Sequence, residues 1–72
     1  MNKPLIASIS DRESEVLRLI SLGHTSNEIA SKLFISVHTA STHRKNLINK
    51  MQVRNTAGLV RRAFEYRLLE IA

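Results

Sequence analysis

The 72-residue sequence contains no cysteine and no tryptophan. Without cysteine there can be no disulfide, no thiolate zinc site and no thiol nucleophile. No apolar run approaches the roughly 20 residues of a membrane-spanning helix, and the N-terminus lacks the apolar stretch of a signal peptide. We therefore expect one small, soluble, cytoplasmic domain with no membrane partner.

Acidic residues are missing from the middle of the chain. Eleven Lys and Arg against six Asp and Glu give a formal net charge of +5, and no acid lies between Glu28 and Glu65. The basic residues of this interval are Lys32, Arg44, Lys45, Lys50, Arg54, Arg61 and Arg62. A solvated surface usually mixes both signs, so this interval favours a polyanion such as nucleic acid as the partner.

Residues 1–8 contain the only proline, Pro4, and show no helical periodicity. This segment is interpreted as a flexible arm or the stub of a linker. Residues 9–72 are then expected to form the folded domain.

Two capping-box patterns predict the first two helices. Ser10 with Glu13, and Thr25 with Glu28, have the spacing at which each side chain satisfies a free backbone amide of the first turn. The first helix is expected to stop at the left-handed Gly23, and the second near Phe34. The expected buried stripes are Val16, Leu17 and Ile20, and then Ile29, Ala30 and Leu33.

Two more helices follow. Ser36 can cap the third, whose inward positions recur at spacings of three and four: Ala40, His43, Leu47 and Met51. Residues 52–55 interrupt the pattern, and a fourth helix, capped by Asn55 or Thr56, is expected to run to about Leu69. No segment alternates with period two. The predicted fold is an all-α four-helix bundle.

The second and third predicted helices, joined by a tight turn, have the form of a helix-turn-helix. At about 100° per residue, the side of the third helix that faces away from its buried positions carries polar side chains and no acid: His38, Ser41, Thr42, Lys45 and Asn49. An ordinary solvated helix face usually carries Glu as well as Lys. This face therefore favours a recognition helix over about Val37–Met51, lying in a DNA major groove.

Four segments of the sequence resemble the LuxR-type, or GerE-type, helix-turn-helix domain of bacterial transcription regulators: SDRESEVL (10–17), GHTSNEIASKL (23–33), ISVHTASTHRKNLINKM (35–51) and VRNTAGLV (53–60). The resemblance covers nearly everything after Ile9, in order and without gaps. It implies a four-helix domain that binds DNA as a dimer, commonly as the output end of a response regulator or a ligand-sensing activator. Three positions depart from the pattern: Ala40 and Ser41 replace the usual Val and Lys, and Gly58 replaces a Glu that would complete a capping box.

The resemblance implies that Ser41, Thr42 and Lys45 read bases, with His38 and Asn49 at the margins. A lysine can donate to guanine O6 and N7, and a threonine offers a methyl group for thymine and a hydroxyl. Phosphate contacts are assigned to helix starts, where free amides favour an anion, and to basic side chains: Thr25, Ser26, Asn27, Ser36, Thr39, Arg44, Lys50 and Arg54. Lys32 is interpreted as a solvated charge.

The apolar residues of the fourth helix spread over roughly half of its circumference, more than one core contact requires. Leu59 and Ala63 are assigned to the core. A dimer contact, similar to that of the family, is assigned to Ala57, Val60, Phe64 and Leu68, with Arg61 at its rim. The alternative is that the extra apolar residues cap the core or meet another domain. A twofold pair would read an inverted repeat with half-sites about ten base pairs apart.

Other classes of function find little support. No HExxH motif, Gly-rich phosphate loop or helical pair of histidines four residues apart occurs, so neither an enzyme nor a metal, cofactor or small-molecule site is expected. His43 is expected to be a packed, hydrogen-bonded histidine. The main alternative is a sigma-factor-like or other protein-binding helical module that docks the transcription machinery, and RNA polymerase remains a possible partner beside duplex DNA.

Overall fold

The computed structural model describes residues 8–69, and this part of the chain forms four helices and no strand. The helices are α1 (Asp11–Ser21), α2 (Ser26–Leu33), α3 (Val37–Met51) and α4 (Thr56–Glu65). The all-α prediction is therefore confirmed. The expected arm, residues 1–8, lies outside the described residues except for Ser8.

The first three helices begin at the predicted N-caps, and the fourth begins at one of its two candidates. Complete capping boxes open α1 at Ser10 and α2 at Thr25. In α3 the Ser36 side chain accepts the Thr39 amide, and in α4 the Asn55 side chain accepts the Gly58 amide. Asn55, not Thr56, is thus the cap of α4, and the Thr56 hydroxyl is available for another contact.

Left-handed residues follow the helices, but only the first of them is a glycine. Gly23 has φ 91°, whereas Phe34, Gln52 and Arg67 adopt φ of 56°, 57° and 59°. The expectation that the fourth helix runs to about Leu69 is wrong, because Arg67 turns the backbone away after Glu65. The Arg67 amide donates to the Phe64 carbonyl and the Leu68 amide to the Ala63 carbonyl, the pair of bonds that closes a Schellman motif.

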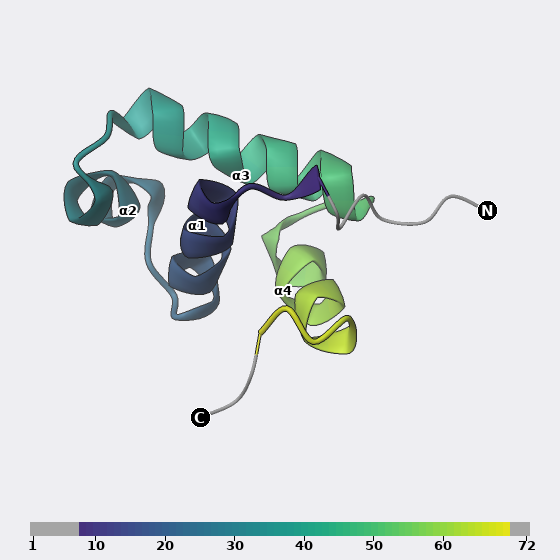
Figure 1. Cartoon of the computed structure of the whole chain (residues 1–72). Helices are drawn as coiled ribbons and strands as arrows, with labels where there is room; N and C mark the ends of the chain where they lie inside the picture. The colour runs from purple at the N-terminus through teal and green to yellow at the C-terminus, as the bar shows by residue number, and fades with distance from the viewer. Residues whose placement is uncertain (1–7, 70–72) are drawn as a thin grey trace.

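The longest helix, α3, runs across the top of Figure 1 and packs against each of the other three. The core that it covers is formed by Val16, Leu17, Ile20, Ile29, Ala30, Ala40, Leu47, Met51, Leu59 and Ala63. Of the positions expected inside, Leu33 and His43 are only half-buried. Three helices pack against one face of α3, and its opposite face is left to solvent. No helix in the described part of the chain is long and apolar enough to cross a membrane.

Candidate nucleic-acid interface

The outward face of α3 consists of the five side chains that the helical period assigns to it. His38, Ser41, Thr42, Lys45 and Asn49 are all exposed. The Thr42 hydroxyl donates to the His38 carbonyl, 3.0 Å away, in the preceding turn. This bond leaves the oxygen lone pairs of Thr42 available as acceptors on the surface.

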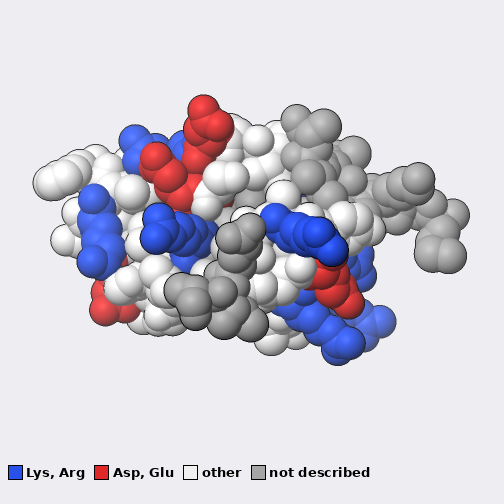
Figure 2. Space-filling model, turned by 60° about the horizontal axis from the view of Figure 1, so that its bottom comes forward, with Lys and Arg blue, Asp and Glu red and all other residues white. Residues whose placement is uncertain are grey.

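Helix α3 carries charges of one sign only. Helix α3 carries Arg44, Lys45 and Lys50 and no acid. Figure 2 brings the bottom of Figure 1 forward, and on this side, away from α3, Asp and Glu lie among Lys and Arg. The charged residues of α3 itself are therefore all cations.

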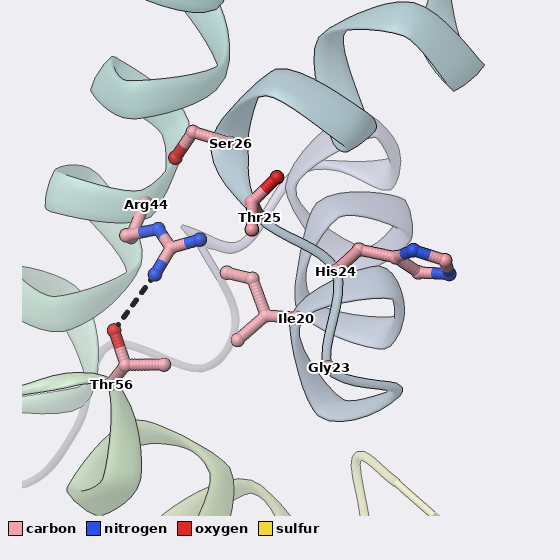
Figure 3. A pocket seen from close by; sticks show the side chains of 7 residues that line it. All are labelled: Ile20, Gly23, His24, Thr25, Ser26, Arg44 and Thr56. Atoms are coloured by element: carbon pink, nitrogen blue, oxygen red, sulfur yellow. Dashed lines mark hydrogen bonds between the residues drawn. The ribbon is translucent and has the colours of Figure 1, made fainter.

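Arg44 does not belong to the outward face, because it lies on the flank of α3 toward the N-termini of α2 and α4. Figure 3 shows its guanidinium in a hollow between the three helices. The hollow measures about 440 Å³ and is lined by Ile20, Gly23, His24, Thr25, Ser26, Arg44 and Thr56. Nη1 of Arg44 donates to Oγ1 of Thr56 over 3.0 Å, and its Nε is buried without a hydrogen-bond partner among the described residues.

The N-terminus of α2 forms one wall of this hollow. The Thr25 hydroxyl accepts the Glu28 amide, so among the first amides of the helix those of Ser26 and Asn27 keep no intrahelical partner. Oε1 of Glu28 accepts the Thr25 amide over 2.8 Å. This backbone hydrogen bond is the main reason why the pKa of Glu28 lies below its ordinary value. Glu28 itself does not line the hollow, and Arg44 supplies the positive charge there.

The start of α3 is organised in the same way. The Ser36 hydroxyl accepts the Thr39 amide and donates to Oγ1 of Thr39. Both hydroxyls are therefore engaged with each other, and an anion at this end would meet the backbone amides that follow Ser36. Arg54 and Lys32 are exposed, Arg54 beyond the C-terminus of α3 and Lys32 on α2.

The structure revises the expectation for Lys50. Its Nζ lies 2.7 Å from Oε1 of Glu13 and 2.8 Å from the Ser8 carbonyl, so its charge is neutralised within the chain. Burial raises the pKa of Glu13. The hydrogen bonds from Lys50 and the Ser10 amide, together with the Lys50 charge, lower that pKa by more, so it lies below the ordinary value. Lys50 therefore joins the C-terminus of α3 to the N-terminus of α1, and we leave it out of the proposed phosphate contacts.

The residues that the sequence assigned to the core or to a dimer contact of the fourth helix divide into three groups. Leu59 and Ala63 are fully buried, as expected. Val60 and Leu68 are half-buried and pack against the core. Ala57, Arg61 and Phe64 are exposed. The free surface of α4 is therefore narrower than the helical period alone suggests, and Phe64 is its large apolar residue.

The histidines form no cluster. No group of three or more His, Cys, Asp or Glu that could hold a metal ion occurs among residues 8–69. His43 lies on the inward edge of α3, but the expected hydrogen bond is not found at its Nδ1, which is buried without a partner in the described part of the chain.

Thr56 is the one residue of the interface that the sequence did not point to. From the sequence, Thr56 was a candidate only for the N-cap of the fourth helix, and Asn55 takes that role. No spacing rule signals its contact with Arg44, because the two residues lie on different helices and meet only after α4 has packed.

Comparison with known proteins gives consistent matches. The family model for bacterial regulatory proteins of the luxR family matches residues 7–63. The transcriptional regulatory protein MctR of Rhizobium johnstonii is 45% identical over 58 residues, which are 81% of this chain and 27% of that protein. The oxygen regulatory protein NreC of Staphylococcus aureus is 40% identical over 62 residues, 86% of this chain and 29% of that protein.

Two solved structures share the fold. The response regulator ChrA of a heme-sensing two-component system superposes with a TM-score of 0.82 at 34% identity, covering 86% of this chain and 31% of that one. The phage VqmA–DPO complex gives a TM-score of 0.82 at 25% identity, covering 90% and 30%. The chain thus spans less than a third of the length of each of these proteins.

Proposed function

The chain belongs to the luxR family of bacterial regulatory proteins, and we propose that it regulates transcription by sequence-specific binding of duplex DNA, with α3 in the major groove. The observation that carries this proposal is the outward face of α3, which is exposed, polar and free of acid along the whole helix. The three helices packed behind it hold it rigid.

Base recognition is assigned to Lys45, Thr42 and Ser41, with His38 and Asn49 at the margins. The Lys45 ammonium is suited to guanine, and Thr42 can offer its methyl group to thymine. The Thr42 hydroxyl already donates within the helix, so toward a base it acts as an acceptor. Ser41 stands where most members of the family have a lysine. The base preference of this chain therefore differs from theirs at the base pair that Ser41 faces.

Phosphate contacts are assigned to the two helix starts, at Thr25, Ser26 and Asn27 and at Ser36 and Thr39, and to Arg44 and Arg54. At both starts the capping hydroxyls are occupied by their own helix. The backbone amides therefore make the contact, and the positive end of each helix dipole supports it.

Dimerisation on DNA is assigned to the exposed side of α4, with Phe64 and Ala57 in the contact, Arg61 at its rim, and Val60 and Leu68 at its edge. One helix per subunit falls below the roughly 1,200 Å² that stable complexes bury. The isolated chain is therefore monomeric and pairs on an inverted repeat whose half-sites lie about ten base pairs apart.

In the cell we assign residues 9–72 to the DNA-binding output domain of a longer response regulator or similar sensor protein, acting in the cytoplasm. The relatives support this assignment, because the match occupies 27% to 31% of their lengths, and one of them is named as the response regulator of a two-component system.

Selection of bound sequences from random duplex DNA, followed by titration of the selected site, tests the proposal. Lys45→Ala should lower affinity for the selected site by about 10- to 100-fold and relax the base preference at one position of each half-site. Lys32→Ala removes the same charge from α2 and should leave the base preference unchanged. Equal binding of all sequences by the parent, or an unchanged preference in Lys45→Ala, would contradict it.

A further inference from the structure

Arg44 has an unusual position for a cation that is to bind DNA. Its guanidinium takes part in no ion pair among the described residues. Its Nη1 donates to Oγ1 of Thr56, and Figure 3 shows the other terminal nitrogen on the side of Thr25. The charge is thus left uncompensated while the side chain is held from one side.

We propose that Thr56 is a positioning residue for DNA binding, because its hydroxyl holds the Arg44 guanidinium in the orientation that binds a backbone phosphate. The proposal rests on the proposed DNA-binding function and adds a residue of α4 to it. An arginine presents its donors in a rigid planar fork. Anchoring one nitrogen at Thr56 therefore sets the direction of the remaining donors.

The lining of the hollow fits a phosphate at this point. Ser26 and Thr25 stand at its α2 wall, where the amides of Ser26 and Asn27 keep no intrahelical partner. No acidic residue lines the hollow. A phosphate oxygen that enters from solvent would meet the guanidinium on one side and these amides on the other, and charge-assisted hydrogen bonds of this kind are among the strong ones.

The role of Thr56 is separable from the stability of α4. Thr56 is the first residue of the helix, and the cap is the side chain of Asn55, which accepts the Gly58 amide over 2.9 Å. Replacing Thr56 by valine preserves the β-branched shape and exchanges the hydroxyl for a methyl group. Thr56→Ser keeps the hydroxyl and serves as the matched control.

The experiment is a double-mutant cycle on DNA affinity over a series of salt concentrations, using the selected duplex and the whole 72-residue chain. Thr56→Val should lower affinity about three- to tenfold and reduce the salt slope by up to about one, as expected for one weakened phosphate contact. Thr56→Ser should bind like the parent. In the Arg44→Gln background, Thr56→Val should have no further effect.

Two results would overturn the positioning role while leaving DNA binding intact: a Thr56→Val variant that binds like the parent at every salt concentration, or one whose loss is the same with and without Arg44. The second result would assign the effect to α4 itself. A parent chain that binds no duplex DNA would instead overturn the proposed function and the role of Thr56 with it.

Discussion

The carboxylate of Glu13 and the ammonium of Lys50 lie 2.7 Å apart, although 37 residues separate them in the chain. Glu13 is the single buried charged residue of the described part, with 4% of its surface exposed. Its Oε1 also accepts the Ser10 amide, so one oxygen serves both the cap of α1 and the end of α3. This contact attaches the C-terminus of α3 to the N-terminus of α1.

The Glu13–Lys50 pair predicts a loss of stability in acid. Because the pKa of Glu13 is lower in the folded chain than in the unfolded one, its contribution is complete above the ordinary value of 4.5 and is lost as the pH falls through the folded pKa. Glu13→Gln keeps the capping-box geometry but removes the charge, and should lower stability at pH 7 by about 1 to 2 kcal/mol. Thermal unfolding of both proteins between pH 7 and pH 3 should show this difference shrinking toward zero. A difference that does not depend on pH would contradict the assignment.

Gly58 predicts a stabilising substitution. It occupies the third position of α4, where a Glu would complete the capping box that α1 and α2 possess. A Cβ there would lie 3.4 Å from Oδ1 of Asn55 and from Cβ of Val53, an ordinary contact. Gly58→Glu should raise the free energy of unfolding by about 1 kcal/mol, and Gly58→Ala by somewhat less. Urea denaturation measures both, and a lower midpoint for the two variants would show that this turn has no room for a side chain.

The assigned phosphate contacts predict steep salt dependence. With about five phosphate contacts per protomer, the slope of log K against log salt should be on the order of −5 per protomer. Titrations of a labelled duplex at several salt concentrations give this slope directly. Lys50→Met should change it little, since Lys50 is paired with Glu13. A slope near zero for the parent would contradict the assigned phosphate contacts.

The exposed side of α4 predicts cooperative occupancy of two half-sites. Phe64 is 36% exposed, so Phe64→Glu should leave the circular dichroism helical while abolishing cooperative binding to the inverted repeat. Ser14→Glu adds the same charge to an exposed position of α1 and is the matched control. A Phe64→Glu variant that still fills both half-sites cooperatively would rule out this dimer contact.

The start of every helix could be predicted from the sequence because a capping bond spans three residues. Ser10 with Glu13, and Thr25 with Glu28, satisfy each other within one turn, and no other part of the chain is needed to form these bonds. The outward face of α3 could be predicted for the same kind of reason: the helical period alone places Lys45 and Thr42 opposite Leu47 and Ala40.

The end of α4 illustrates the opposite case. Arg67 adopts a left-handed conformation that costs a residue with a Cβ about 1 kcal/mol or more, and helical propensity gives no indication of it. Leu68, the next residue in the chain, packs against the core. The helix therefore stops where burial of Leu68 and the two closing hydrogen bonds outweigh the local preference of the chain.

The sequence by itself determined four helices, the N-caps of the first three, the acid-free face of α3 and the resemblance to the LuxR-type domain, because each depends on residue types at short spacings. Only the tertiary structure decided which cations remain available. Lys50 and Arg44 are both basic residues of α3 that the sequence assigned to phosphates, yet Lys50 meets Glu13 across 37 residues and Arg44 meets Thr56 across 12. One partner neutralises its cation and the other leaves it charged. That difference depends on the angles at which α1 and α4 pack against α3, which no local spacing encodes.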